Sequence, residues 1–550
     1  MERPARRVTR RALLGSAAAG GTALALGTGH GAWGMPVPAT ADGPWIEATI
    51  GDLQELMASR QLSSLELTRA YLDRIEVLDP ILHSVIETNP LAQLVAVVRD
   101  LERKLGHVRG PLHGIPILLK DNIATIDLMQ TTAGSLALVG SRPPGDAPLV
   151  ARLRRAGAII LGKTNLSEWA NFRGGRPDGI PMNGWSGRGG FTRDPYVLDF
   201  DPCGSSSGSA VAPAANLCAA AVGTETDGSI VCPAGNNLVV GLKPTVGLVS
   251  QQGIIPIAHS QDTAGPMGRT VSDVATLLNA LVTPFGPVAG KTLPADYTAF
   301  LRRGGLKGAR VGVDRRLFQE DYFALPEINA VVEVAIEAMA GLGATIVDPV
   351  DSGDPAVWSE DEFTVLLQEF KVDIAAYLST LRRTRMRTLA DLIAFDIEHC
   401  EQEMTYLDQS VFEAAEATNG DLSDPAYLAA RANSLRAARD EGIEKAMADH
   451  DLDVIVSPSY GFGSSAPAVA GYPIISVPVG LAENGWPAGI WMTARFLEEP
   501  KLLALAYDLE QELQARVQPG FNGEVPEPPP DLGLCGAPAT SAASASEARA

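Results

Sequence analysis

Hydrophobic residues follow two different patterns along this chain. Near the start they repeat at helical spacing, with Ile50, Leu53 and Met57 on one side of a helix, and Ser63 and Glu66 then form a capping box that begins a second helix. Farther along, short segments are apolar at almost every position, as in strands covered on both faces of a sheet. These segments are residues 114–120, 157–163, 309–314, 344–350, 453–457, 472–480 and 488–494. The pattern therefore predicts the α/β class.

Two regions depart from this pattern. Residues 355–450 are rich in Ala, Leu, Glu and Arg and mostly helical in spacing, with Asp424 and Pro425 as the N-cap and first residue of a helix. Strand-like segments resume directly afterwards, so we expect a helical insertion over the site, at one edge of the sheet, rather than a separate domain. The last fifteen residues contain no large apolar side chain, and we expect residues 521–550 to form a disordered tail.

The first 41 residues have the features of an export signal. The pair Arg10-Arg11 precedes an uncharged apolar run that continues to Leu26, and Ala39-Thr40-Ala41 matches an A-x-A cleavage site. The apolar run is too short to span a membrane. We therefore expect a twin-arginine signal peptide over residues 1–41, export to the periplasm or the cell exterior, and no membrane attachment after cleavage.

Charge and cysteine content exclude several classes of partner. With a net charge of -21 and a pI near 4.8, the chain has the wrong sign to bind a nucleic-acid backbone. Its five cysteines, at positions 203, 218, 232, 400 and 535, are odd in number and form no C-x-x-C pair. That spacing argues against a disulfide framework or a zinc site and allows at most one or two disulfides. No metal ion or other cofactor is expected.

Residues 203–209, CGSSSGS, contain four serines that are candidates for catalysis. The stretch matches a G-x-S-x-G nucleophile elbow centred on Ser206, but an elbow follows directly after a strand. The preceding residues 193–203 are rich in proline and aspartate, as in a loop, so the match is interpreted as accidental. A lysine is the alternative base: Lys120 ends an apolar segment, at the carboxyl end of a buried strand, where α/β sheets carry their sites.

Five segments resemble, in this order, the amidase signature family: GPLHGIPILLKDNI, GKTNLSEWANF, the long Gly/Ser segment from Cys203 to Ser250, QDTAGPMGRTVSD and YPIISVPVG. Within the family, GWSGRGG, DPCGSSSGSA and GTETDGSIVCPA are most similar to bacterial peptide amidases. The resemblance implies a single large domain over residues 42–520. Its fold would be a central mixed, mostly parallel sheet covered by helices on both faces.

The resemblance also implies a catalytic triad of two serines and a lysine. In that triad Ser229 is the nucleophile, Ser205 is the bridging serine and neutral Lys120 is the base. The Gly204–Ser205 peptide bond is expected to be cis. A free lysine has a pKa of about 10.4, which burial without a carboxylate partner lowers. Asp121 is therefore expected to point away from the lysine.

Supporting roles are expected for four further residues: Ser206, Thr226, Asp227 and Gly228. Ser206 would hydrogen-bond Lys120, and the backbone N–H groups of the tight turn 226–229 would stabilise the oxyanion of the reaction. Asp227 stands where the family commonly has glycine, and two roles remain open for it: orienting a peptidic substrate or capping its own turn. Glycines of the family pattern are also replaced by Cys203 and Ser207.

The expected reaction is removal of ammonia from C-terminal peptide amides, so the expected partner is a small-molecule or peptide amide. A broad amidase or esterase acting on small acyl or aryl amides is the alternative. A component of a tRNA-dependent amidotransferase is less favoured, because export and the charge of -21 argue against a role beside tRNA. The sequence predicts neither the oligomeric state nor the preferred peptide.

Overall fold

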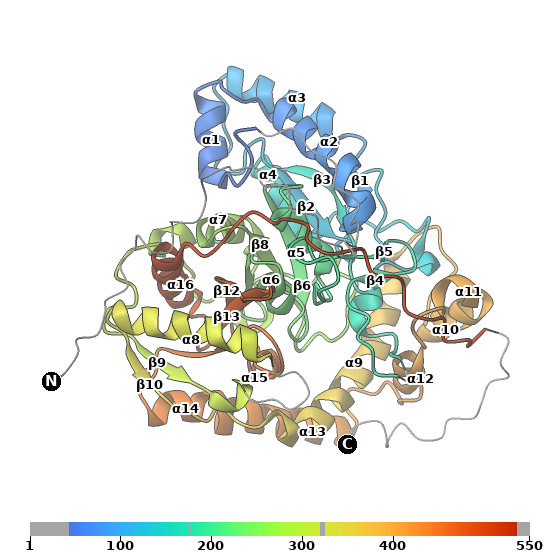
Figure 1. Cartoon of the computed structure of the whole chain (residues 1–550). Coiled ribbons are helices and arrows are strands. Elements are labelled where there is room, and N and C mark those ends of the chain that lie inside the picture. Colours follow the sequence, from blue (N-terminus) through green and yellow to red (C-terminus); the bar gives the residue numbers. More distant parts are fainter. Residues whose placement is uncertain (1–42, 177, 319–324, 536–550) are drawn as a thin grey trace, which may run out of the picture. The chain divides into compact units, whose positions relative to one another are not determined.

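The computed structural model describes residues 43–176, 178–318 and 325–535. The expected signal peptide, residues 1–41, lies outside these ranges. The core is an eleven-stranded sheet in the order β1-β3-β2-β6-β8-β7-β12-β13-β11-β9-β10, and β4 and β5 form a separate ribbon (Figure 1). The strands are β1 (Val85–Thr88), β2 (Pro116–Lys120), β3 (Ile159–Thr164), β4 (Trp185–Ser186), β5 (Gly190–Phe191), β6 (Ala220–Glu225), β7 (Val240–Lys243), β8 (Thr263–Gly268), β9 (Arg310–Val313), β10 (Thr345–Val347), β11 (Val454–Pro458), β12 (Ile474–Leu481) and β13 (Pro487–Thr493).

Helices cover both faces of this sheet, because successive side chains of a strand point to opposite faces. On β12, Ile474 packs with Val231 of helix α6 (Val231–Asn236), whereas Ile475 and Val477 lie in a second cluster. Helices α7 (Val271–Leu281), α8 (Pro326–Gly341) and α16 (Glu499–Leu513) complete that second cluster. The α/β class and the two helical layers are confirmed.

The strand directions correct one expectation. Parallel pairing occurs in β3–β2–β6 and in β11–β9–β10. The central strands from β6 to β11, and β1 at one edge, pair antiparallel. The sheet is mixed, as expected, but the expectation that it is mostly parallel was wrong. Central strands such as β12 and β13 are joined by short turns, which make neighbouring strands antiparallel. In the β12–β13 turn the Ala482 N–H donates to the Trp486 carbonyl over 2.8 Å.

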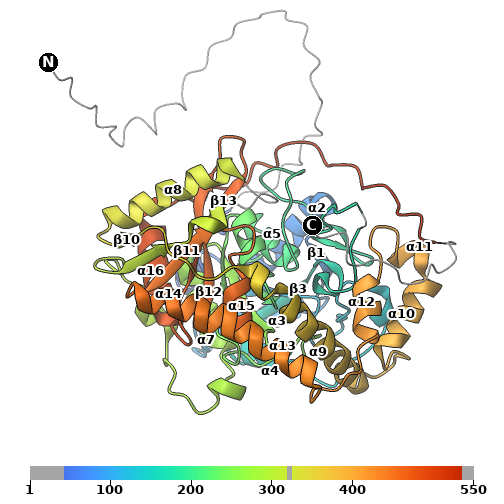
Figure 2. The same cartoon turned by 90° about the horizontal axis from the view of Figure 1, so that it is seen from below.

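The region from 359 to 449 is mostly helical and lies along the lower and right-hand sides of Figure 1. Figure 2, from below, shows α9 and α13 lying beside each other. A π-helical turn, Arg436–Ile443, joins α13 to α14. The helices are α9 (Ser359–Thr380), α10 (Leu389–Glu398), α11 (Cys400–Glu403), α12 (Ser410–Glu416), α13 (Pro425–Leu435) and α14 (Glu444–Asp449).

Three consecutive residues of the loop before β8 connect this helical region to the rest of the chain. His259 Nδ1 lies 2.9 Å from Asp373 Oδ2, and the Ser260 N–H donates to Glu369 over 2.9 Å. Gln261 Nε2 donates to Glu362 over 2.8 Å. All three carboxylates belong to α9, and we call this set of contacts the α9 clasp.

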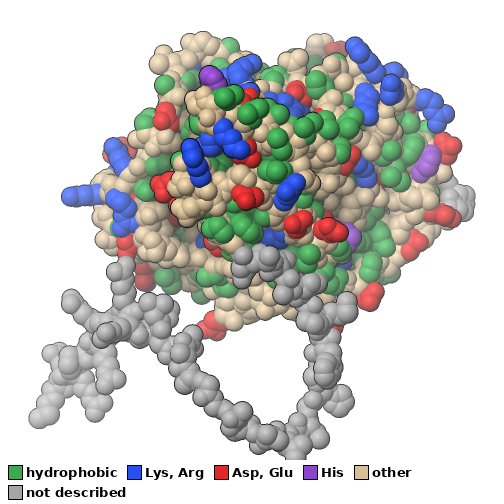
Figure 3. Space-filling view, turned by 90° about the horizontal axis from the view of Figure 1, so that it is seen from above, with side chains coloured by type: hydrophobic (Ala, Val, Ile, Leu, Met, Phe, Trp, Pro, Cys, Tyr) green, Lys and Arg blue, Asp and Glu red, His purple; other side chains and the backbone are tan. Residues whose placement is uncertain are grey.

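Helix α3 (Ala92–Lys104) faces the protein with the small residues Ala92 and Ala96 and with polar side chains. Asp100 accepts hydrogen bonds from the Ser64 and Leu65 N–H groups at the start of α2 (Ser64–Leu82). Its outer side exposes Leu94 and Leu101, and hydrophobic side chains are frequent on that face of the molecule (Figure 3). None of the helices in the described ranges is both long and apolar enough to cross a membrane.

Residues 521–535 differ from the disordered tail expected from 521 onwards. They run as an extended strap across the molecule (Figure 1). The Phe521 N–H donates to the Pro195 carbonyl over 2.9 Å, and the Leu532 N–H donates to the Thr405 carbonyl over 3.0 Å. Backbone hydrogen bonds hold this strap against the molecule, and Phe521 packs against the hydrophobic core. Residues 536–550 lie outside the described ranges.

Candidate active site

The candidate catalytic residues meet at the carboxyl ends of two neighbouring strands. Lys120 is the last residue of β2, and Ser229 follows β6, which pairs parallel with β2. Ser205 and Ser206 come directly before helix α5 (Ser207–Ala214). Parallel strands bring their carboxyl ends to the same edge of a sheet, so this topology gathers residues that are far apart in the sequence.

Lys120 is completely buried, and only neutral groups accept its hydrogen bonds. Its Nζ donates to Ser205 Oγ over 2.7 Å, to Ser206 Oγ over 2.9 Å and to the Thr224 carbonyl over 3.2 Å. Burial lowers the pKa of Lys120 to about 7, although the charges of Glu225 and Asp262 act in the opposite direction. A large fraction of the amine is therefore neutral near pH 7 and able to accept a proton.

Asp121 turns away from Lys120, as expected. Its Oδ2 accepts hydrogen bonds from the Thr132 hydroxyl and the Gly134 N–H, and its cationic neighbours are Lys163 at 3.9 Å and Arg188 at 3.4 Å. The adjacent carboxylate is thus engaged elsewhere and does not hold Lys120 in the charged form.

The loop that carries Ser205 is fixed on both sides. The Gly204–Ser205 peptide bond is cis, as expected, and a Cβ on Gly204 would lie 2.3 Å from Ser167 Oγ, so a side chain there would displace Ser167. The Ser167 N–H donates to the Ser205 carbonyl, and the Ser206 N–H donates to the Ser229 carbonyl, each over 3.1 Å. Backbone contacts thus join this loop to the segment that carries Ser229.

The turn before Ser229 is organised by a carboxylate that the sequence analysis did not single out. Glu225, 1% exposed, accepts from the Gly228 N–H over 3.0 Å with one oxygen. With the other it accepts from the Ile230 and Val231 N–H groups over 2.7 and 3.0 Å. Burial raises the pKa of Glu225. The carboxylate thereby caps the start of α6 directly after Ser229.

This cap corrects part of the expected oxyanion site, because the Gly228 N–H is already bonded to Glu225. Within the described residues, the N–H groups of Thr226, Asp227 and Ser229 have no hydrogen-bond partner, so they are the donors still available to a ligand. Gly228 serves the turn through its positive φ of +74° instead. Ser229 is 7% exposed, and its hydroxyl is not hydrogen-bonded to any described residue.

Asp227 contacts a segment that is distant in the sequence. Its Oδ1 accepts from the Ser464 hydroxyl over 2.6 Å, just before helix α15 (Ser465–Ala470), and no hydrogen bond to its own turn is present among the described residues. Burial raises the pKa of Asp227. Burial, and secondly the charge of Asp227, raise the pKa of Glu362 on α9 to about 8. Asp227, two residues before Ser229, is therefore close enough to Glu362 for the two carboxyl groups to disfavour each other's charge.

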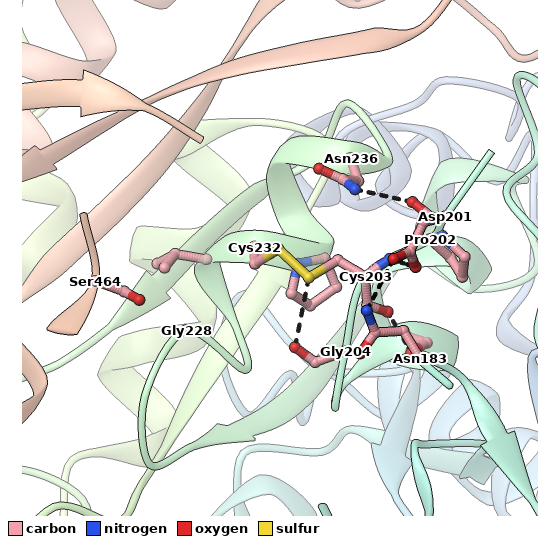
Figure 4. Close-up of a disulfide and its surroundings, with 12 residues drawn as sticks. Asn183, Asp201, Pro202, Cys203, Gly204, Gly228, Cys232, Asn236 and Ser464 are labelled. Atoms are coloured by element: carbon pink, nitrogen blue, oxygen red, sulfur yellow. Dashed lines mark hydrogen bonds between the residues drawn. A yellow bond between two sulfur atoms is a disulfide. The ribbon is translucent and has the colours of Figure 1, made fainter. Parts of the chain in front are cut away.

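Two disulfides are present, within the one or two that the cysteine count allowed. Cys203 is bonded to Cys232 beside the Ser205 loop (Figure 4), and Cys400 is bonded to Cys535 on the strap. Cys218 is free and buried. Five cysteines allow many pairings, so the sequence alone did not identify these two.

The fold and the site define the class of protein. The amidase family model matches residues 66–503, and the chain belongs to the amidase family: it is an enzyme that hydrolyses amides.

Individual relatives agree with this assignment. The peptide amidase of Stenotrophomonas maltophilia has a crystal structure that superposes with a TM-score of 0.82 at 49% identity, over 87% of this chain and 100% of that one. A probable amidase of Arabidopsis thaliana is 42% identical over 86% of this chain and 92% of its own length. The crystal structure of an amidase family protein from Bacillus anthracis superposes with a TM-score of 0.79 at 36% identity, over 86% of this chain and 92% of that one.

Proposed function

We propose that this amidase removes ammonia from C-terminal peptide amides, with Ser229 as nucleophile, Ser205 as proton relay and Lys120 as base. The observation that carries the proposal is the buried Lys120 amine, whose hydrogen bonds go to two serine hydroxyls and one carbonyl. A lysine that is neutral near pH 7 and bonded to a serine is suited to receive a proton from that serine.

In the proposed reaction, the Ser229 oxygen attacks the amide carbon and its proton passes to the Ser205 oxygen. Ser205 in turn gives its own proton to the Lys120 amine. The oxyanion is stabilised by free backbone N–H groups among Thr226, Asp227 and Ser229. When the C–N bond breaks, the proton returns from Lys120 through Ser205 to the nitrogen and ammonia leaves. Water then cleaves the acyl-Ser229 ester by the same relay, releasing the free acid.

The preference for peptide amides is supported by two observations. The peptide amidase of Stenotrophomonas maltophilia shares 49% identity over its whole length. In addition, Asp227 and Ser464 present hydrogen-bonding groups beside Ser229, where the N–H groups of a peptide need acceptors. An amidase for aryl or acyl amides does not need hydrogen-bonding groups such as Asp227 and Ser464 beside the nucleophile.

The test is ammonia release from a peptide amide, an aryl amide and a fatty amide by the wild type, Ser229→Ala and Lys120→Ala. We expect the peptide amide to have the highest kcat/KM and each substitution to lower kcat by about a thousandfold or more. Full activity of Ser229→Ala would contradict the triad. A higher kcat/KM for the aryl amide would instead favour the broad amidase.

We also propose that the protein is exported by the twin-arginine route. The two disulfides support this proposal, because disulfides form and persist in oxidising compartments. We expect the exported form to begin at Asp42, as read by intact mass, and the double substitution Arg10→Lys and Arg11→Lys to retain the protein inside the cell. Export of that variant at the normal level would contradict the route, while amidase activity in a cell lysate controls for folding.

A further inference from the structure

A covalent bond joins the two segments that carry Ser205 and Ser229. Cys203 lies two residues before Ser205, and Cys232, in the first turn of α6, lies three residues after Ser229 (Figure 4). We propose that the Cys203–Cys232 disulfide is a positioning element of the amidase site, so that full activity requires the oxidised bond. This inference rests on the proposed roles of the two serines.

The backbone at Cys203 explains why a tether is needed there. Its φ is +54°, in the left-handed region, where a residue other than glycine costs about 1–2 kcal/mol. The family pattern has glycine at this position, which takes that conformation without the cost. A cysteine in its place favours a different backbone unless another interaction holds it, and the bond to Cys232 supplies that interaction.

Helix α6 and its C-cap residue, Asn237, supply two further anchors of the segment. Asn236 Nδ2 donates to the Asp201 carbonyl over 2.8 Å, and Asn237 Nδ2 donates to the Pro202 carbonyl over 2.9 Å. Figure 4 shows Asn236 reaching Asp201 on the same side of the loop as the disulfide. The disulfide and these two hydrogen bonds tie residues 201–203 to α6 and its C-cap residue, while Asn183 Nδ2 holds the Asp201 carboxylate over 2.9 Å. A relaxation at Cys203 therefore moves Ser205 relative to Ser229.

The chain between Cys203 and the reacting groups has little conformational freedom. A Cβ on Gly204 would clash with the Ser167 side chain, and Ser205 Oγ accepts a hydrogen bond from the Lys120 amine. Displacements of about 1 Å in an active site lower rates by as much as a hundredfold. A shift at Cys203 is therefore passed to the proton relay rather than absorbed by the loop.

The bond is within reach of a small reductant. Cys203 and Cys232 are both partly exposed, whereas Cys218 is completely buried. A dithiol such as dithiothreitol transfers two electrons and two protons to the disulfide, which becomes two thiols, and is itself oxidised to a cyclic disulfide. Removal of the reductant and mild oxidation reverse the step.

The experiment compares kcat and KM for a peptide amide before reduction, after reduction and after reoxidation, well below the unfolding temperature. We expect reduction to lower kcat by about tenfold or more, with a much smaller change in KM, and reoxidation to restore it. Alkylation and mass spectrometry identify which cysteines have been reduced. Circular dichroism before and after reduction shows whether the fold is retained.

Three double variants separate positioning from simple stabilisation. Cys203→Ser with Cys232→Ala keeps a residue with a Cβ at position 203 but removes the tether, so the backbone there is free to relax and we expect low kcat. Cys203→Gly with Cys232→Ala removes the strain as well, so it should keep more activity and be insensitive to reductant. Cys400→Ser with Cys535→Ser removes the disulfide on the strap, and this matched control should keep both wild-type activity and wild-type sensitivity to reductant.

The inference is overturned if Cys203 and Cys232 are alkylated while kcat is unchanged. It is also overturned if sensitivity to reductant disappears in the Cys400/Cys535 variant. Either outcome leaves the triad intact as long as Ser229→Ala is inactive. Activity in Ser229→Ala would instead show that the proposed function had failed, whatever the effect of reduction.

Discussion

Three buried lysines in this protein have a lowered pKa, and their hydrogen-bond partners distinguish them. Burial lowers the pKa of Lys163 and Lys243 to about 8, and nearby carboxylates, Asp121 and Glu225 respectively, offset part of the effect. Lys163 Nζ donates to a carbonyl and a threonine, and Lys243 Nζ donates to the Tyr472 carbonyl. Among the three, Lys120 is the one that donates to serine hydroxyls, and its pKa is lowered further, to about 7.

This environment predicts the pH dependence of the reaction. Protonated Lys120 cannot accept the proton of Ser205, so kcat/KM should rise with pH and level off above an apparent pKa of about 7. Stopped assays on a peptide amide across the neutral range provide the measurement. The titration of Asp262 must be distinguished from that of Lys120, because burial raises the pKa of Asp262 to about 7 as well. The rise should persist in Asp262→Asn, and its disappearance there would contradict the assignment to Lys120.

At the scale of elements, one carboxylate connects a strand, a turn and a helix. Glu225 ends β6 and accepts the N–H groups of Gly228, Ile230 and Val231, so it holds Ser229 between the strand and α6. Helix α6 has only six residues and lacks a side-chain cap at its own N-cap residue, Ile230. Glu225 at the end of β6 therefore supplies the side-chain cap that α6 lacks.

Removal of this carboxylate should affect both stability and catalysis. Glu225→Ala leaves three buried N–H groups without an acceptor, and we expect a loss of about 3 kcal/mol in the free energy of unfolding. Glu225→Gln keeps one acceptor oxygen and should lose less. Denaturant unfolding monitored by fluorescence, together with kcat, measures both effects. Equal losses in the two variants would show that the hydrogen bonds to Glu225 are not the cause.

The sequence predicted some of these elements and not others, for physical reasons. The apolar segments 114–120 and 157–163 became β2 and β3, and the strand-end position of Lys120 followed from the pattern alone. Strands β6 (AAVGTE) and β8 (TAGPMG) are rich in alanine, glycine and proline, which have low strand propensity. They are strands because they pair with each other, β6 also with β2 and β8 also with β7, and a local pattern does not contain that information.

The sequence likewise predicted some of the candidate site residues and missed others. Ser205 and Ser229 were singled out by resemblance to a family, since nothing in their local spacing separates them from neighbouring serines. Glu225 was missed because a buried glutamate at a strand end has no sequence signature. Strand directions and cysteine pairing depend on long-range contacts, so those expectations were wrong or left open.

At the scale of the whole molecule, the α9 clasp connects the helical region to the active site. Asp262, next to the clasp residues, accepts from the Thr226 hydroxyl over 2.5 Å. The hydrogen bond to Asp373 raises the pKa of His259. Protonated His259 is thus favoured in the folded protein, so the stabilisation is fully present below the unfolded pKa of about 6.5 and is lost as pH rises through the folded value.

We therefore expect His259→Gln to lower the unfolding free energy more at acidic than at alkaline pH. The side chain of His259 is 45% exposed, so solvent screening limits the difference to about 0.5 kcal/mol. Thermal unfolding of the wild type and the variant at several pH values gives this difference. A difference in unfolding free energy that stays constant across the pH range would contradict a stabilising role for protonated His259.

The strap and its disulfide make the carboxyl-terminal region hard to remove by cutting the backbone. Glu524 and Val525 are both exposed, whereas Cys535 is bonded to Cys400 on α11. A glutamyl endopeptidase that cleaves after Glu524 should therefore leave the fragment from Val525 onward attached, so that a gel run without reductant shows one full-size band and a gel run with reductant shows two. Release of the fragment without reductant would contradict the bond. A protease cut at this place therefore breaks the backbone while the strap stays covalently attached to the molecule through Cys535.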